Sequence, residues 1–318
     1  MSVFVEQNVE IKRVLGKYDQ KKPGPTIICF GGMHGNEHAA IYALNHVAKL
    51  LSEKQPDFRG KFLAISGNMS ALQDRVRYKD QDLNRIWTTE NIHRLKQNLP
   101  LPHHSTVEMA EQANIFSEIK PYLTTSGFPV YALDLHTTSA ESHPFIIIQD
   151  KSISRKFALN FHAPIILGLL NHLKGSLIQY LEDVEGCLTM AFEAGQHDDE
   201  RSIHRHIAAI WIAMVSAGCI EEKNVPDPDY EDYQEYLRET LRDVPKIFQV
   251  RYSYRIRSEE NFVMEPGFVN FQSIKKGELL AHSNTEEITS HEDGNIFMPL
   301  YQAQGDDGYF IIRKIEGY

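Results

Sequence analysis

Near the start of the chain, a histidine and a glutamate stand at a spacing that suits a metal ion. Residues 26–30 are apolar and partly β-branched, which predicts a strand buried on both faces. Gly31 and Gly32 allow a tight turn. His34 and Glu37 follow, three residues apart at the expected start of a helix, so their side chains can point to one spot. Zinc takes imidazole nitrogen and carboxylate oxygen as ligands. A helix cap beside an incidental surface histidine explains the same pattern.

A second histidine, His136, ends another apolar run, VYALDLHTT, which predicts a strand. Ligands of open α/β sheets bind where the parallel strands end, so we expect His136 to approach His34 and Glu37. Three protein ligands with one free position for water are typical of a catalytic zinc site. Asp134 lies two residues earlier on the same strand face. It either orients a metal ligand or caps the loop.

The chain also offers a proton acceptor and a cluster of cations. Glu193 ends the apolar run CLTMAFEAG, where a partly desolvated carboxylate near a metal would act as general base and then general acid. The loop RVRYKDQDLNRIW carries Arg77, Asn84 and Arg85, and arginine matches carboxylates and stabilises an oxyanion. The ordinary alternatives are a strand-end carboxylate without a role and a solvated loop of Asp–Arg pairs.

The elements that must position these residues alternate between strand and helix through about residue 220. Strands are expected in TIICFGG, GKFLAISGN, VYALDLHTT, FIIIQ, PIILGLL and CLTMAFEAG, and helices over residues 37–51, 107–120, 152–160 and 200–215. This alternation predicts an α/β fold with a mostly parallel, mixed sheet flanked by helices. His204 and His206, in the last helix, are expected to face water.

The C-terminal third has a different pattern. An acidic segment interrupted by Pro226 and Pro228 predicts a linker helix. Short strands separated by glycine-containing turns then predict a small all-β module, which resembles the barrel-sandwich modules that carry lipoyl and biotinyl groups. The predicted units are a zinc-dependent catalytic α/β domain (1–222), a linker helix (223–244) and a β-rich C-terminal domain (245–318).

Composition restricts the classes of partner. The 318 residues are 42% apolar and 24% charged, as in a soluble globular protein. A net charge of −10 argues against nucleic acid as a partner. The chain has no apolar run of membrane-spanning length and no signal-peptide pattern, and its three cysteines are odd in number and far apart. We therefore expect a cytoplasmic protein that binds neither nucleic acid nor membrane; homo-oligomer formation is left open.

Four motifs together resemble one known family. GGMHGNE, RYKDQDLNR, DLHTTS and FEAG occur here in the order found in the succinylglutamate desuccinylase/aspartoacylase family, within the zinc carboxypeptidase-like enzymes. The resemblance covers most of the chain. It implies that His34, Glu37 and His136 bind one zinc ion and that Glu193 activates a water molecule.

The same resemblance assigns residues to the substrate. Arg77 would polarise the scissile carbonyl, and Asn84 and Arg85 would hold the α-carboxylate of the substrate. Tyr309 in DDGYFIIRK is the best match to a tyrosine that reaches the substrate from the C-terminal module in aspartoacylases.

One segment departs from the family pattern. Aspartoacylase-like members carry an arginine about ten residues before the catalytic glutamate, where it helps to bind the acidic substrate. Here that stretch contains Glu182, Asp183 and Glu185. Because a carboxylate pairs poorly with an acidic side chain, we expect a substrate whose side chain is neutral or cationic, or whose acid group lies elsewhere.

The sequence thus predicts a zinc-dependent amidohydrolase that removes the acyl group from a small N-acyl amino acid. A carboxypeptidase or an esterase with the same zinc site is the alternative within the enzymes. A non-catalytic small-molecule binding protein of the same fold is the alternative outside them, and the presence of all three zinc ligands and the glutamate base argues against it.

Overall fold

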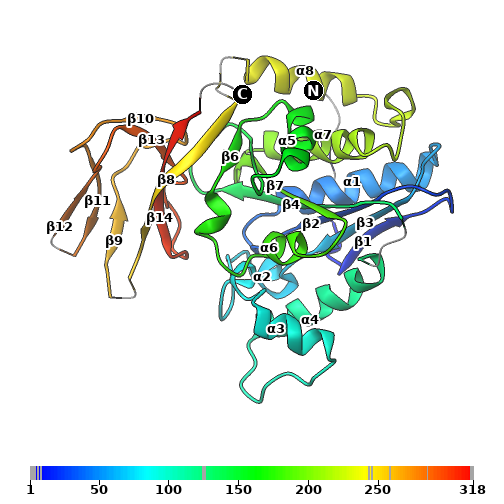
Figure 1. Ribbon diagram of the computed structural model, residues 1–318, viewed down its shortest axis with the longest axis horizontal. Coiled ribbons are helices and arrows are strands. Elements are labelled where there is room, and N and C mark those ends of the chain that lie inside the picture. The colour runs from blue at the N-terminus through cyan, green and yellow to red at the C-terminus, as the bar shows by residue number, and fades with distance from the viewer. Residues whose placement is uncertain are drawn as a thin grey trace.

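Short apolar runs form the central strands, as their residue types predict. The computed structural model describes residues 5, 7, 9–123, 127–242, 244, 246–257, 259–284 and 286–315. Within them, an eleven-stranded sheet has the order β1-β3-β2-β4-β7-β5-β6-β8-β14-β13-β10, and a separate antiparallel sheet has the order β12-β11-β9 (Figure 1). The central strands are β1 (Val14–Tyr18), β2 (Thr26–Gly31), β3 (Lys61–Ser66), β4 (Val130–Thr138), β5 (Phe145–Ile147), β6 (Ile165–Leu167) and β7 (Cys187–Gln196).

The middle of the large sheet is mostly parallel. β2 pairs with β3 and β4, β4 pairs with β7, and β5 pairs with β6, all in parallel, whereas β5 runs antiparallel to β7. Because the parallel strands end at one edge, β2, β4 and β7 bring their carboxyl ends together. This edge is where the sequence places the candidate ligands.

Helices cover both faces of this sheet (Figure 1). The helices on one face are α1 (Ala39–Lys54), α5 (Ser152–Ala158), α7 (Arg201–Ser216) and α8 (Tyr230–Thr240). Those on the other are α2 (Met69–Asp74), α3 (Thr89–Lys96), α4 (Val107–Ile119) and α6 (Leu177–Glu182). Short 3₁₀ turns are η1 (Leu83–Arg85), η2 (Lys120–Tyr122), η3 (Leu159–Phe161), η4 (Leu169–Asn171) and η5 (Glu222–Asn224).

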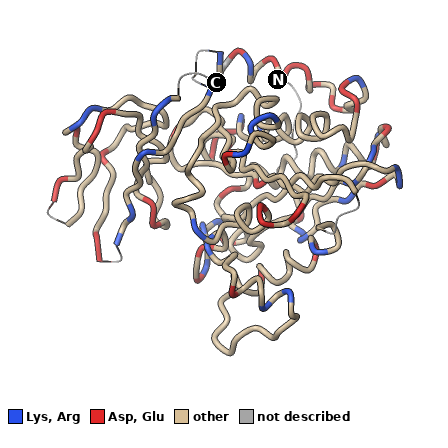
Figure 2. Tube along the Cα trace, in the orientation of Figure 1, with Lys and Arg blue, Asp and Glu red and all other residues tan. Residues whose placement is uncertain are grey.

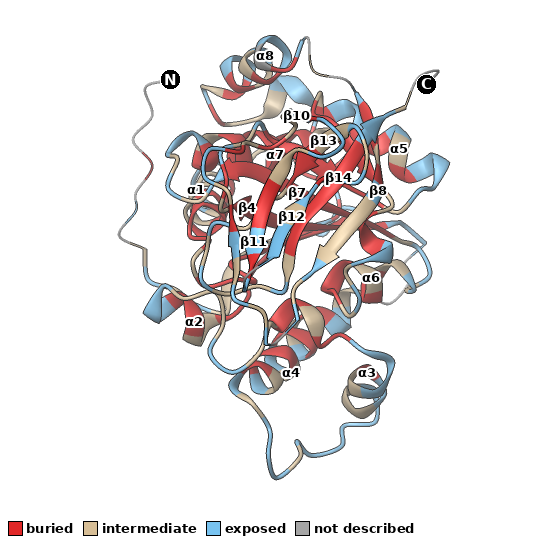
Figure 3. Ribbon diagram, turned by 90° about the vertical axis from the view of Figure 1, so that its left-hand side faces the viewer, coloured by how far each residue is buried: buried red, intermediate tan, exposed pale blue. Residues whose placement is uncertain are grey.

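Alternate residues of β2 belong to different cores. Ile27 and Cys29 pack in the cluster beneath α1 and α7, and Ile28 and Phe30 pack in the cluster beneath α4. All four side chains are fully buried. Figure 3 shows β4 and β7 coloured as buried at the centre, with exposed residues gathered on the outer helices and loops. The strand is therefore fixed from both sides, and so is the turn that follows it.

The C-terminal strands either continue the large sheet, as β8, β14, β13 and β10 do, or form the separate sheet, as β9, β11 and β12 do. They are β8 (Ile247–Arg255), β9 (Phe262–Met264), β10 (Ser273–Ile274), β11 (Leu279–Ser283), β12 (Glu286–Thr289), β13 (Gly294–Phe297) and β14 (Asp307–Lys314). β8 pairs in parallel with β6, with Ile165 opposite Ile247, so the expected C-terminal module shares a sheet with the preceding α/β part of the chain. The boundaries at residues 222 and 245 stay predictions, and residue 245 itself lies outside the described residues. The helix expected between them is present as α8, which packs on α7 through Tyr230, Tyr233 and Leu237.

The predicted mixed α/β fold with a large, mostly parallel sheet and helices on both faces is confirmed, as is a small antiparallel sheet near the C-terminus. The strand β1 and the helices α2, α3 and α6 were not predicted. Acidic and basic residues are interspersed along the outer helices and edge strands (Figure 2). Within the described part of the chain, no helix combines the length and the apolar character needed to cross a bilayer.

Candidate active site

The turn after β2 places the first two candidate ligands. Glu37 donates its backbone N–H to the carbonyl of His34 at 3.1 Å, and α1 begins only at Ala39. The helix therefore begins two residues later than the predicted start at residue 37, and the turn before it brings the two side chains together. Gly35 is required here because a Cβ atom would lie 2.1 Å from the backbone carbon of Ala71 in the neighbouring helix α2.

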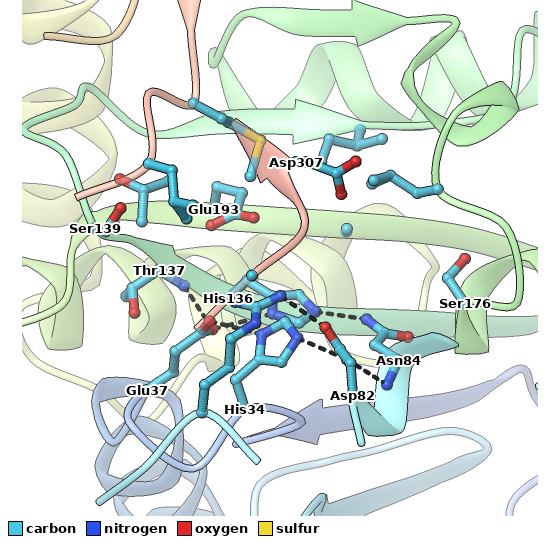
Figure 4. Close-up of a pocket in the computed structure, with 18 of the residues that line it drawn as sticks. His34, Glu37, Asp82, Asn84, His136, Thr137, Ser139, Ser176, Glu193 and Asp307 are labelled. Atoms are coloured by element: carbon cyan, nitrogen blue, oxygen red, sulfur yellow. Dashed lines mark hydrogen bonds and ion pairs between the residues drawn. The ribbon is translucent and has the colours of Figure 1, made fainter. Parts of the chain in front are cut away.

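His34, Glu37 and His136 converge in a buried cluster whose ligand atoms lie within 4.8 Å of one another. The Nδ1 atom of His34 is 2.7 Å from one carboxylate oxygen of Glu37, and the Nδ1 atom of His136 is 3.0 Å from the other (Figure 4). Thr137 donates its backbone N–H to the same oxygen as His136, also at 3.0 Å. Burial would raise the pKa of Glu37, but the two imidazoles outweigh it and hold that pKa well below its ordinary value.

The opposite nitrogen of each imidazole faces a carboxylate. The Nε2 atom of His34 is 3.2 Å from Asp82, and the Nε2 atom of His136 is 2.9 Å from Asp134. A carboxylate behind a histidine keeps the proton on that nitrogen and leaves the other free to bind a metal. Both Nδ1 atoms face the carboxylate of Glu37, and a bound metal would take the place of the proton between each ring and that carboxylate while Nε2 keeps its own. Of the two roles considered for Asp134, this geometry favours orienting a ligand.

The donor set fits a zinc ion. Two imidazole nitrogens and one carboxylate, buried together with carboxylates behind the imidazoles, are typical ligands of catalytic zinc. Three protein donors leave a coordination position for a water molecule or a substrate.

Glu193 lies beside this cluster on β7. It pairs with His136 across the two strands, is 5% exposed, and has one carboxylate oxygen without a hydrogen-bond partner among the described residues. Burial is the main cause that raises the pKa of Glu193 to about 8, and the nearby carboxylates of Glu37 and Asp134 raise it further. A carboxyl group with a pKa near neutrality can both accept and return a proton.

Arg77, Asn84 and Arg85 all line the same cavity as the metal-site cluster. Arg77 pairs with Asp82 at 2.9 Å, but its buried Nε atom has no partner in the part of the chain that the structure describes. The amide nitrogen of Asn84 donates to Asp134 at 3.2 Å, and its oxygen accepts the backbone N–H of Leu177 at 2.8 Å.

Arg85 pairs with a residue that the sequence did not suggest. Its guanidinium lies 3.0 Å from Asp307, and Arg255 pairs with the second oxygen of that carboxylate at 2.8 Å. Asp307 begins β14, so the C-terminal segment reaches the cavity through an acidic side chain.

Tyr309 does not line the cavity, contrary to the expectation that it reaches the substrate. Its side chain is 1% exposed and stacks on Tyr254 with ring centroids 5.4 Å apart, within the core of the C-terminal strands. Its neighbour Phe310 lines the cavity instead, because successive residues of a strand point to opposite faces.

The acidic segment that departs from the family pattern also lies elsewhere. Glu182 pairs with Lys151 at 2.6 Å, and both Glu182 and Asp183 line a separate surface pocket beside Trp87. Glu182 and Asp183 therefore do not line the cavity that holds His34, Glu37 and His136. They cannot exclude an acidic substrate from it by direct repulsion.

Further side chains at the site could not be identified from local motifs. The Nδ1 atom of His197 forms a hydrogen bond of 2.8 Å with the hydroxyl of Thr137, and its Nε2 atom lies 3.3 Å from the side-chain oxygen of Gln302. The same oxygen of Gln302 accepts a hydrogen bond from Asn36. Gln302 follows His197 by more than a hundred residues, so only the fold brings them together.

A parallel-sheet edge that carries two histidines, a glutamate and a buried carboxyl group is typical of metal-dependent α/β hydrolases. More narrowly, the chain belongs to the succinylglutamate desuccinylase/aspartoacylase family, a family of deacylases, since the model of that family's catalytic domain matches residues 23–210.

Individual relatives agree with this assignment. An aspartoacylase from Xenopus tropicalis is 33% identical over 136 residues, which is 40% of this chain and 39% of that protein. A succinylglutamate desuccinylase from Photorhabdus laumondii is 26% identical over 179 residues, 54% of this chain and 53% of that protein. The matches thus span about half or less of these relatives. A succinylglutamate desuccinylase/aspartoacylase structure from Rhodobacter sphaeroides shares the fold, with a TM-score of 0.65 and 17% identity over 92% of this chain and 87% of that one.

Proposed function

We propose that the protein is a zinc-dependent amidohydrolase that removes the acyl group from a small N-acyl amino acid. The observation that carries this proposal is the meeting of His34, Glu37 and His136 with the buried carboxyl group of Glu193 in one cavity. Bound there, zinc would act as a Lewis acid toward the scissile carbonyl and would lower the pKa of a water molecule.

The protein's own groups supply the remaining steps. Glu193 accepts a proton from the attacking water and returns it to the leaving amine, for which its raised pKa is suited. Arg77 lines the cavity, and its guanidinium stabilises the negative charge that develops on the carbonyl oxygen. Asn84 and Arg85, which both line the cavity, hold the α-carboxylate of the substrate.

A substrate panel tests the proposal. The purified chain is loaded with zinc and given N-acetyl and N-succinyl amino acids, dipeptides and amino-acid esters, and the released amine or alcohol is measured. Glu193→Gln is the matched variant, because it keeps the shape and removes the base. Turnover of acyl amino acids that falls by two or more orders of magnitude in the variant supports the proposal. Turnover restricted to dipeptides or esters, or unaffected by the variant, would contradict it.

A further inference from the structure

The cavity has two chemically different halves. One half contains the His34–Glu37–His136 cluster with Arg77 and Arg85, and the other half is apolar. The apolar wall, as we name it, consists of Ile147, Leu170, Ile178, Ala191, Met298 and Phe310. These residues come from six separate elements or loops and belong to, or pack on, one hydrophobic cluster.

The apolar wall lies next to Glu193 and Arg85, because its residues are neighbours of these groups on the same or adjacent strands. Ala191 precedes Glu193 by two residues on β7, so both side chains lie on the same face of the sheet. Ile147 pairs with Ala191 across β5 and β7. Phe310 follows Asp307, the partner of Arg85, on β14. The wall thus extends from the general base to the side of the cavity where Arg85 lies.

The charges of the cavity leave no place for a second substrate carboxylate. Among the described residues that line it, Arg77 and Arg85 are the permanent cations, and each already pairs with an aspartate, Asp82 or Asp307. Arg85 keeps donors for one α-carboxylate, because its guanidinium carries five N–H groups. A second carboxylate would face the apolar wall without a partner, and burying an unpaired charge is unfavourable.

We infer that the protein selects N-acyl amino acids whose side chain is apolar, with that side chain against the apolar wall. This inference rests on the proposed function, because binding of the α-carboxylate by Arg85 fixes the direction in which the side chain of the substrate extends from its Cα atom. An acidic N-acyl amino acid such as N-acetylaspartate is a poor substrate for the same reason.

The test compares side chains while the acyl group stays constant. The zinc-loaded full chain is given N-acetyl-leucine, N-acetyl-methionine, N-acetylglycine, N-acetylaspartate and N-acetylglutamate, and kcat/KM is measured for each. We expect kcat/KM for the leucine and methionine compounds to exceed that for N-acetylglycine by at least roughly 10- to 100-fold, the effect of about one methylene group in an apolar pocket. Equal or higher kcat/KM with the acidic compounds would overturn the inference and leave the proposed function intact.

Two variants locate the preference at the wall. Ile178→Arg introduces a cation there and should lower the ratio of kcat/KM for N-acetyl-leucine over N-acetylaspartate at least tenfold. Leu170→Ala introduces no charge and serves if Ile178→Arg does not fold. It should lower the ratio of kcat/KM for N-acetyl-leucine over N-acetylglycine about tenfold. Ile153→Arg, at a residue of α5 that is 64% exposed and outside the cavity, is the control and should change neither ratio. Ratios that both wall variants leave unchanged would overturn the inference.

A binding experiment separates this inference from the proposed function. If none of the compounds is hydrolysed, the proposed function fails, and calorimetric titration of the same zinc-loaded chain with the same compounds still ranks their affinities. Tighter binding of N-acetyl-leucine than of N-acetylaspartate supports the apolar wall as a side-chain site. The reverse order, or binding of neither, overturns it. A series in which longer acyl chains on glycine bind as tightly as N-acetyl-leucine would assign the wall to the acyl group and overturn the stated direction.

Discussion

Glu108 holds the loop that carries the arginines of the site. It lies in the first turn of α4 and is fully buried. One carboxylate oxygen accepts the backbone N–H of Lys79 at 2.7 Å and the side-chain amide of Asn68 at 3.0 Å. The other accepts the backbone N–H groups of Asp80 and Gln81 at 3.2 and 3.3 Å. These backbone groups lie between Arg77 and Asp82, so Glu108 acts on the site through them.

Replacing Glu108 by glutamine preserves the shape and turns one acceptor oxygen into a donor. Whichever oxygen is replaced, two of the four donors lose their acceptor. A buried donor without a partner costs about 1–3 kcal/mol, so Glu108→Gln should lower the free energy of unfolding by roughly 2–6 kcal/mol. It should also lower kcat/KM, because Arg77 and the Asp82 carboxylate behind His34 lose their fixed position.

Urea denaturation of the two proteins measures the first effect, and zinc-loaded activity measures the second. Glu118→Gln is the matched control on the same helix, since its side chain is partly exposed and pairs only at the surface with Lys17. That variant should change stability by less than about 1 kcal/mol. Equal stability of Glu108→Gln and Glu118→Gln would refute the reasoning.

Two further predictions concern buried polar groups. His206 is fully buried, neither ring nitrogen has a partner among the described residues, and burial lowers its pKa to about 3. Since the unfolded chain takes up that proton near pH 6.5 and the folded chain does not, stability falls as the pH drops from about 6.5 toward 3, by about 1.4 kcal/mol per pH unit. The wild type should lose about 2 kcal/mol more than His206→Leu between pH 7 and pH 5 in denaturant titrations; identical pH profiles would contradict this. Asp134→Asn should weaken zinc affinity about 10- to 100-fold in chelator competition, because the carboxylate orients His136. Asp150→Asn on the surface is its control, and equal affinities would show that Asp134 has no such role.

The fold was predictable where local composition decides it. The runs around β2, β4 and β7 are apolar and partly β-branched, and their alternation with helical segments indicates a parallel sheet. The meeting of the three candidate ligands was predictable for the same reason. His34 and Glu37 follow the end of β2, His136 lies near the end of β4, and a parallel sheet brings strand ends together.

The features that could not be predicted depend on which face of a strand or helix points to the cavity. Contacts with residues far away in the sequence determine this. Tyr309 and Phe310 are adjacent, and an irregular pairing between β14 and β8 just before Tyr309 decides which of them faces the cavity. His206 was expected to face water, but α7 is covered by both the sheet and α8, so His206 is buried together with Ser202 and Arg205. Asp307 meets Arg85 across more than two hundred residues, which no local pattern indicates.

Metal content tests the central claim most directly. The purified wild type, His136→Ala and His104→Ala are each supplied with zinc, dialysed and analysed for bound metal; His104 is exposed and lies outside the site. The account predicts about one zinc ion per chain in the wild type and in His104→Ala, and little in His136→Ala. Absence of zinc from all three proteins, or equal zinc in all three, would contradict a metal site built from His34, Glu37 and His136.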